Sequence, residues 1–288
     1  MIRQTLGNSD GLSEHGKSMT PDKPVIVTIA GSDSGGGAGI QADLKTINAI
    51  GNFGASALTC LSAQNPDGIS GILELDPDFL EKQVRAIFSY FPVAAVKTGM
   101  LFSKPLISRL STLIHEFKAS GHAFRLVVDP VMVATSGVKL LQDSAIESLI
   151  LELIPMADLI TPNLDEAHLL GTDIVSSISE MDPAAKFLSQ KYGISVLLKG
   201  GHLKNVSEAI DVLALPDGNT TVYSKPFVPN FYPHGTGCTY SSAIASYWAK
   251  GHSLPESISL AKEFLHAAIE QAYSIGKSKT LNHNPKIF

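Results

Sequence analysis

Hydrophobic residues are concentrated in short continuous runs along the chain, and longer amphipathic segments separate these runs. The first run is V-I-V-T-I-A at residues 25–30, a largely β-branched stretch typical of a strand buried on both faces. A helix is predicted directly after it, from residue 40 to residue 50, with Ile40, Leu44 and Ile47 on one stripe. Further runs, each predicted as a strand, lie at 55–63, 93–97, 125–129, 157–161 and 194–198. Helix-like segments lie at 78–90, 104–119, 142–153, 164–170 and 182–191.

This alternation of strands and helices predicts the fold class. Strands that alternate with helices form a parallel sheet with helices on both faces, so we expect an α/β protein. Residues 209–228 interrupt the alternation and are predicted as a β-hairpin around P-D-G-N. After residue 239 the pattern is mainly helical to about residue 275, and the last residues are expected to fray.

The N-terminal segment differs from the rest of the chain. Residues 1–22 are polar, rich in Gly and Ser and without period, so they are predicted to be a disordered tail ahead of one domain at 23–288. Residues 11–18 match the phosphate-binding pattern G-x-x-x-x-G-K-[ST]. That loop works only between a strand and a helix, and neither is predicted around it. We interpret the match as chance.

Composition and charge narrow the possible partners. The chain has 288 residues and a formal net charge of −5, which gives no reason to expect binding to nucleic acid or to an anionic membrane. No apolar run is long enough to span a bilayer. Cys60 and Cys238 lie far apart without metal-ligand spacing, so free thiols and a cytoplasmic location are expected.

The stretch P-H-G-T-G-C-T-Y-S-S-A-I-A, residues 233–245, predicts a glycine-containing turn that opens into a helix. The turn comprises Gly235, Thr236, Gly237 and Cys238. Backbone N–H groups at a helix N-terminus are unpaired and carry partial positive charge, so an anion is the natural ligand there. The same field is expected to lower the pKa of the Cys238 thiol.

Polar side chains follow most of the predicted strands. Ligands in open α/β sheets bind beyond the carboxyl ends of the strands, so we expect these side chains to meet. Asp129 and Glu166 are candidate ligands for Mg²⁺, most simply through water, and Lys199 supplies a cation for phosphate oxygens. Phosphoryl transfer needs mainly positioning and charge neutralisation. The residues alone therefore favour an ATP-dependent kinase acting on a small molecule.

Seven motifs, in order, resemble those of one enzyme family. They are A-G-S-D-S-G-G-G-A-G-I-Q-A-D-L-K-T (30–46), A-Q-N (63–65), V-K-T-G-M-L (96–101), D-P-V-M (129–132), T-P-N-L-D-E-A (161–167), L-L-K-G-G-H (197–202) and H-G-T-G-C-T (234–239). The chain resembles the hydroxymethylpyrimidine/phosphomethylpyrimidine kinases of thiamine biosynthesis, which belong to the ribokinase-like superfamily. The resemblance covers roughly residues 24 to 275, and seven ordered motifs are far more specific than any one of them.

The resemblance implies a three-layer α/β/α fold and a homodimer. It also implies transfer of the ATP γ-phosphoryl group to the hydroxymethyl oxygen of a 4-amino-2-methylpyrimidine. The monophosphate is then phosphorylated again to the diphosphate. ATP and Mg²⁺ are the implied cofactors.

Site residues follow from the same resemblance. Gln64 would hydrogen-bond the aminopyrimidine, because a side-chain amide offers both a donor and an acceptor. The pyrimidine pocket would be lined by Asp43, the backbone of Gly31, Met100 and Val131. Mg-ATP would be organised by Asp129, Asn163 and Glu166, with Lys199 on its phosphates.

Cys238 occupies the place where related sugar kinases carry an aspartate base, so the resemblance makes it the group that accepts the hydroxyl proton. The alternative is that the anion-binding turn and the metal carry catalysis while Cys238 shapes the pocket.

Two other functions remain open at this point. One is a pyridoxal or pyridoxine kinase, because that substrate is also a flat heteroaromatic with a hydroxymethyl arm. The other is a non-catalytic pyrimidine-binding protein, against which the presence of Asp129, Glu166 and Lys199 argues.

Overall fold

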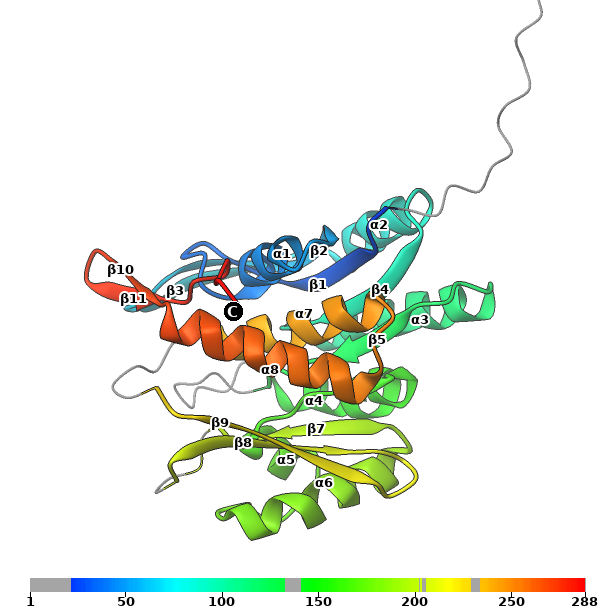
Figure 1. Ribbon diagram of the computed structural model, residues 1–288. Coiled ribbons are helices and arrows are strands. Elements are labelled where there is room, and N and C mark those ends of the chain that lie inside the picture. Colours follow the sequence, from blue (N-terminus) through cyan, green and yellow to red (C-terminus); the bar gives the residue numbers. More distant parts are fainter. Residues whose placement is uncertain (1–21, 133–140, 202, 204–205, 229–233, 288) are drawn as a thin grey trace, which may run out of the picture.

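The computed structural model describes residues 22–132, 141–201, 203, 206–228 and 234–287. The disordered tail predicted at 1–22 therefore lies almost wholly outside the described residues. Within them, one large sheet is covered by helices on both faces (Figure 1).

The sheet in the described part of the chain has nine strands in the order β3-β2-β1-β4-β5-β6-β7-β8-β9. The central strands from β2 to β7 are parallel to their neighbours, whereas β3, β8 and β9 add antiparallel edges. Their bounds are β1 (Val25–Asp33), β2 (Phe53–Asn65), β3 (Gly68–Glu74), β4 (Val93–Thr98), β5 (Arg125–Val128), β6 (Leu159–Ile160), β7 (Ser195–Lys199), β8 (Glu208–Ala214) and β9 (Thr220–Pro226).

The helices lie in two layers, one on each face of the sheet. They are α1 (Gly39–Ala49), α2 (Pro77–Phe88), α3 (Lys104–Ala119), α4 (Asp143–Ser148), α5 (Leu164–Leu169), α6 (Ile178–Tyr192), α7 (Thr236–Ala249) and α8 (Leu254–Glu270). No helix among the described residues is both long and apolar enough to cross a membrane.

Alternate residues of the strands contribute to two separate hydrophobic cores. Ile26 of β1 packs with residues of α1, α7 and α8, whereas Val27 and Ile29 pack with residues of α2 to α6 on the other face. Burial on both faces is what the continuous apolar run at 25–30 predicts. The predicted α/β/α sandwich with a mainly parallel sheet is confirmed.

Several helix ends carry local signals that explain where they begin. Asp76 accepts hydrogen bonds from the N–H groups of Asp78 and Phe79, and Pro77 follows it at the first helical position of α2. Helix α5 opens with a capping box, because Asn163 accepts from the N–H of Glu166 and the Glu166 carboxylate accepts from the N–H of Asn163.

The structure also corrects three expectations. Strand β3 was not predicted, because its residues are exposed on both faces and show no burial pattern. The helical region ends at Glu270 rather than near residue 275, and a small hairpin follows, β10 (Tyr273–Ile275) and β11 (Ser278–Thr280). The C-terminal residues expected to fray are held in place: the N–H of Asn282 donates to Ala268 O, and Gln271 makes two hydrogen bonds with the Lys286 backbone.

The predicted hairpin at 209–228 is confirmed as β8 and β9. It pairs with β7 and so extends the main sheet at its edge. The helix predicted at 142–153 is present as α4 followed by a π-helical turn at Leu149–Leu153.

Candidate active site

The candidate site lies where the parallel strands end at their carboxyl edge. Asp33 ends β1, Asp129 follows β5, Asn163 follows β6 and Lys199 ends β7. Helix α7 begins over these ends at Thr236. The rule that ligands bind beyond the carboxyl ends of the strands predicts this convergence, which the fold produces.

The turn before α7 has the geometry of an anion cradle. Gly235 is the N-cap of α7 and adopts a left-handed conformation (φ 83°), and no side chain in the described part of the chain caps the helix. The first-turn N–H groups therefore lack a capping side-chain acceptor. A Cβ atom at Gly237 would lie 3.4 Å from Lys199 Nζ and 3.6 Å from Asp129 Oδ2, so the turn lies directly against the charged groups of Lys199 and Asp129.

Asp129 and Lys199 form the charged centre of the site. Lys199 Nζ lies 2.9 Å from Asp129 Oδ1, and Thr161 Oγ1 donates to the same oxygen at 3.0 Å. Burial alone would raise the pKa of Asp129, but the nearby ammonium groups of Lys199 and Lys97 outweigh it and lower that pKa. The pKa of Lys199 is raised, because the Asp129 and Glu166 carboxylates overcome its burial. Both groups are therefore charged at neutral pH.

Glu166 is held beside this pair by backbone groups. Its Oε1 accepts from the N–H of Met132 at 3.1 Å, and its Oε2 accepts from the N–H of Asn163 at 2.9 Å. Burial raises the pKa of Glu166 to about 7, and the charge of Asp129 adds to the effect. Asn163 contributes its side chain to the helix cap rather than to the open face of the site.

Whether the Asp129 and Glu166 carboxylates fit Mg²⁺ depends on how many hydrogen bonds their oxygen atoms already accept. Each oxygen named above accepts one or two hydrogen bonds, and Asp129 Oδ2 lies 3.3 Å from Ser241 Oγ. Carboxylate oxygens have further acceptor capacity. No group of three or more His, Cys, Asp or Glu side chains that could hold a metal occurs in the described ranges. The pair therefore fits Mg²⁺ that keeps several water ligands, as this ion commonly does.

Cys238 differs from the expectation in its electrostatics. The pKa of its thiol is raised to about 11, because burial disfavours the thiolate and the Asp43 and Asp129 carboxylates repel it. The Lys97 ammonium opposes this change and does not overcome it. The prediction that the helix N-terminus lowers this pKa is wrong, since desolvation is the larger effect.

Asp43 does not line an open pocket. It is fully buried and accepts hydrogen bonds from Lys97 Nζ at 2.8 and 2.9 Å, from Thr28 Oγ1 at 2.6 Å and from Ser242 Oγ at 2.7 Å. Its carboxylate thereby joins α1 to β1, β4 and α7. In this structure the packing leaves no exposed surface on Asp43, and its place in the pyrimidine pocket stays a prediction.

Gly31, Met100 and Val131 lie at neighbouring strand ends. The N–H of Gly31 donates to Met100 O at 3.1 Å, and a Cβ atom at Gly31 would lie 2.8 Å from Cys60 Sγ and 2.9 Å from Met100 Cε. Val131 has a positive φ of 44°, which is unusual for a β-branched residue. Backbone strain of this kind is concentrated at functional sites.

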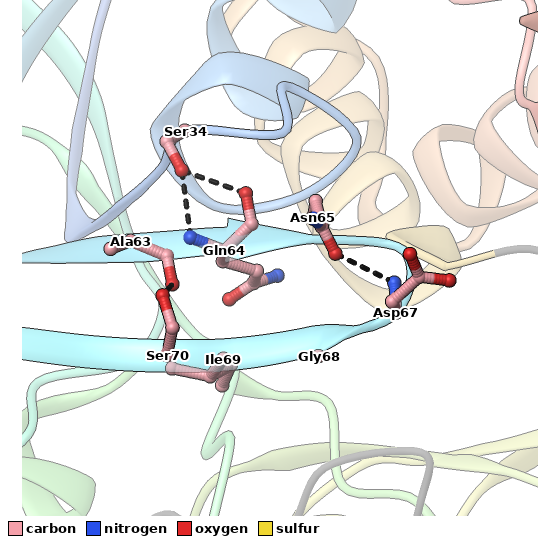
Figure 2. Close-up of a pocket in the computed structure, with 8 residues that line it drawn as sticks. All are labelled: Ser34, Ala63, Gln64, Asn65, Asp67, Gly68, Ile69 and Ser70. Carbon is pink, nitrogen blue, oxygen red and sulfur yellow. Dashed lines mark hydrogen bonds between the residues drawn. The ribbon is translucent and has the colours of Figure 1, made fainter. Parts of the chain in front are cut away.

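Gln64 lies on the wall of an open pocket of about 510 Å³ between the ends of β2 and β3 (Figure 2). The other lining residues are Ser34, Ala63, Asn65, Asp67, Gly68, Ile69 and Ser70. The Nε2 atoms of Gln64 and His234 lie 3.0 Å apart.

Ser34, His234 and Asp33 are candidate site residues that our reading of the sequence did not single out. Ser34 and Asp33 belong to the glycine-rich motif after the first strand, and His234 belongs to the motif before Gly235. Those motifs were the available signal. Only the fold brings the two motifs into contact, at His234 and Gly37.

The fold and the charged centre beneath the α7 turn define the class of this protein, an ATP-dependent kinase of small molecules. The family model for phosphomethylpyrimidine kinase matches residues 33–283. The chain belongs to this family.

Individual relatives agree with this assignment. The chain is 45% identical over 250 residues to the hydroxymethylpyrimidine/phosphomethylpyrimidine kinase of Rhizobium meliloti, covering 86% of this chain and 91% of the relative. It is 44% identical over 260 residues to the thiamine biosynthesis bifunctional protein ThiED of Geobacter sulfurreducens, covering 90% of this chain. The chain spans about half, 52%, of that longer protein.

Solved structures share the fold over nearly the whole domain. An ADP complex of Bacillus subtilis pyridoxal kinase superposes with a TM-score of 0.83 at 35% identity, covering 91% of this chain and 98% of that one. The phosphomethylpyrimidine kinase of Clostridium difficile superposes with a TM-score of 0.75 at 39% identity, covering 86% and 100%.

Proposed function

We propose that the protein phosphorylates 4-amino-5-hydroxymethyl-2-methylpyrimidine to its monophosphate and then to the diphosphate, in thiamine biosynthesis. The observation that carries the proposal is the contact between the uncapped α7 turn and the Lys199–Asp129 pair. Such an arrangement neutralises charge on a transferring phosphoryl group. The relatives named as hydroxymethylpyrimidine/phosphomethylpyrimidine kinases support the choice of substrate.

In this proposal the phosphate side of the reaction is bound by α7 and the ends of β5 to β7. The turn of Gly235, Thr236 and Gly237 offers backbone N–H groups to the transferred phosphoryl group, and Lys199 offers its ammonium group. Asp129 and Glu166 would hold Mg²⁺, and Asn163 keeps Glu166 in place through the capping box. Bound Mg²⁺ would neutralise phosphate charge.

The substrate side is formed by the ends of β1, β2, β4 and β5. Gln64 hydrogen-bonds the aminopyrimidine, and Gly31, Met100 and Val131 surround the ring. Glycine is required at position 31 because Cys60 and Met100 already fill the space that a side chain would need. Asp43 supports this side of the site by joining α1 to β1, β4 and α7.

Cys238 lies in the first turn of α7, next to the transferred group. A thiol pKa near 11 leaves it neutral at pH 7. This favours a role in shaping the pocket over a role as proton acceptor. The variant Cys238→Ala distinguishes the two roles. Loss of a proton acceptor would lower kcat about 100-fold or more, whereas loss of a residue that only shapes the pocket would lower it far less.

We also propose that the protein is a homodimer in which the edge strand β3 takes part. Exposed apolar residues gather on β2 and β3: Leu61, Ile69, Ile72 and Leu73. Among the residues that the structure describes, no strand pairs with the outer edge of β3, and unpaired edges with apolar side chains favour association. Light scattering should show a dimer for the natural chain and a shift towards monomer for Leu73→Lys.

ATP consumption is the experiment that tests the proposed function. Hydroxymethylpyrimidine, its monophosphate and pyridoxal are offered as parallel acceptors, with and without Mg²⁺. Turnover on both pyrimidines that is lost without Mg²⁺ supports the proposal. Turnover on pyridoxal alone would move the protein to the second candidate, a pyridoxal kinase, which the similarity to pyridoxal kinase structures favours. Pyrimidine binding without any turnover would leave the non-catalytic binding protein.

A further inference from the structure

The glycine-rich loop after β1 contains its own anion. Asp33 Oδ1 accepts from the N–H of Gly35 at 2.8 Å, and Oδ2 accepts from the N–H groups of Gly37 at 3.1 Å and Ala38 at 2.8 Å. Asp33 is 4% exposed. The N–H groups that would suit a phosphate are therefore occupied by a carboxylate of the chain, so this loop binds no phosphate while the contact persists.

The same loop sets the position of the turn before α7. A Cβ atom at Gly235 would lie 1.9 Å from the carbonyl oxygen of Gly37, so the two backbones are in direct contact. Movement of Gly37 must therefore displace Gly235 or break this contact. From the other side of the loop, Lys45 Nζ donates to Gly36 O at 2.7 Å.

The loop also contacts the backbone of Gln64 through Ser34, and His234 from the segment before α7 lies next to both the Gln64 side chain and Asp33. Ser34 Oγ donates to Gln64 O at 2.7 Å and accepts from the N–H of Gln64 at 2.8 Å, which fixes the backbone (Figure 2). His234 Nε2 lies 3.0 Å from Gln64 Nε2 and 3.6 Å from Asp33 Oδ2. His234 therefore lies between Asp33 and the side chain of Gln64, and Gly37 lies between Asp33 and Gly235.

We infer that Asp33 is a positioning residue that couples the pyrimidine-binding end of β2 to the phosphate-binding turn at 235–238. The inference rests on the proposed function, because it concerns the two halves of that site. Asp33 does not touch the substrate. It keeps Gln64 and the α7 turn in one relative geometry, so that a bound ring presents its hydroxymethyl oxygen to the phosphoryl group.

The charge of Asp33 is consistent with this role. Burial alone would raise its pKa, but His234 and the N–H groups of Ala38 and Gly35 outweigh that effect and lower the pKa. The carboxylate is therefore ionised at neutral pH. Hydrogen bonds to an ionised acceptor are about twice as strong as neutral ones.

The test is the variant Asp33→Asn, which keeps the size of the side chain and removes the charge. One amide oxygen cannot accept all three N–H groups, so both contacts of the loop should loosen. We expect kcat to fall about tenfold and the KM for hydroxymethylpyrimidine to rise about fivefold, as for the loss of a charge-assisted hydrogen bond. The KM for ATP should change less than about twofold, because Lys199 and the metal ligands are untouched.

The matched control is Asp76→Asn. Asp76 also accepts two backbone N–H groups, those of Asp78 and Phe79, but it does so at the start of α2, outside the candidate site. This variant should lower the melting temperature and leave kcat and both KM values unchanged. A merely structural role for Asp33 would give the same result as this control.

A double-mutant cycle with Gln64→Ala separates the two arms of the coupling. If Asp33 acts on the pyrimidine through Gln64, the rise in pyrimidine KM caused by Asp33→Asn should disappear in the Gln64→Ala background. The fall in kcat should persist, because it is transmitted through Gly37 and Gly235. Should Asp33→Asn not fold, Asp33→Ser is measured in the same cycle, since its hydroxyl can still accept one N–H group.

Two outcomes would overturn the inference while the proposed function stands. In the first, the natural enzyme turns over both pyrimidines and the Asp33→Asn variant has the same kcat and KM values as the natural enzyme. The other is full additivity of the two substitutions in pyrimidine KM. No turnover by the natural enzyme would instead overturn the proposed function, and the inference with it.

Discussion

The two glycines of the turn before α7 allow stability and catalysis to be separated, because the structure assigns them different constraints. Gly237 has no positive φ, and a Cβ atom there would meet Lys199 Nζ at 3.4 Å and Asp129 Oδ2 at 3.6 Å, ordinary contact distances. Replacing glycine by alanine within a helix stabilises it by about 0.5–1 kcal/mol. We therefore expect Gly237→Ala to fold with unchanged or slightly increased stability.

The methyl group of Gly237→Ala would nevertheless stand between the turn and the ion pair, where the phosphoryl group is proposed to bind. Loss of one such electrostatic contact costs about 100-fold to 1,000-fold in kcat. We expect a loss of that size, measured as ATP consumption with hydroxymethylpyrimidine as acceptor.

Gly235→Ala should show the opposite pattern in stability. Its φ of 83° is left-handed, which costs a residue with a Cβ atom about 1–2 kcal/mol. The same Cβ atom would lie 1.9 Å from Gly37 O, and relieving such an overlap costs about 1–3 kcal/mol more. The free energy of unfolding in urea should therefore fall by about 2–5 kcal/mol.

Both variants are measured by circular dichroism in urea and by ATP consumption under identical conditions. Full activity of Gly237→Ala would refute the placement of the phosphoryl group against Lys199 and Asp129. Unchanged stability of Gly235→Ala would refute the tight contact with Gly37.

Three further predictions concern charge. Lys199→Met should lower kcat about 100-fold or more. The control is Lys250→Met, which loses a hydrogen bond to Ile50 O at the far end of α7 and should lower only the melting temperature. Equal losses of kcat in the two variants would contradict the role of Lys199. The rate of Cys238 alkylation, measured by mass spectrometry, should increase with pH up to pH 10, because only the thiolate reacts and the thiol pKa is about 11. A rate that no longer increases above a pH below 9 would show a lowered pKa. Burial lowers the pKa of His283 to about 4, so this residue binds more protons in the unfolded chain below about pH 6.5. Its contribution to the free energy of unfolding should therefore fall by up to about 1.4 kcal/mol per pH unit between pH 6.5 and 4, seen as the difference between the natural protein and His283→Gln. His283→Gln should lack this loss, and an identical pH dependence of the two proteins would exclude it.

Local patterns in the sequence determined the main architecture. The run at 25–30 predicts a strand buried on both faces, and its alternate residues do enter two cores. The alternation of strands and helices predicts the parallel sheet, because the spacing of apolar residues differs between a strand and a helix according to which of their faces are buried. Asp129, Glu166 and Lys199 could be predicted together, because residues that follow parallel strands meet at one edge.

Only the tertiary structure decided which of the candidate side chains are exposed and what charge they carry. Asp43 belongs to the same motif as the exposed Ser34, but folding buries it against Lys97. Cys238 occupies a helix N-terminus, which lowers a thiol pKa, yet burial and two carboxylates raise it. Such desolvation depends on atoms from distant parts of the chain, so no local pattern contains it.

The coupling of the two glycine motifs has the same origin. The sequence shows that residues 30–46 and 234–239 both contain glycines, but it does not show that the backbone N–H groups of the first segment are occupied by a carboxylate of the chain itself. That outcome depends on Asp33 turning back onto Gly35, Gly37 and Ala38. The contact of Gly37 with Gly235 then depends on the packing of α1 against α7, which lie about 200 residues apart in the chain and meet only when the sheet has formed.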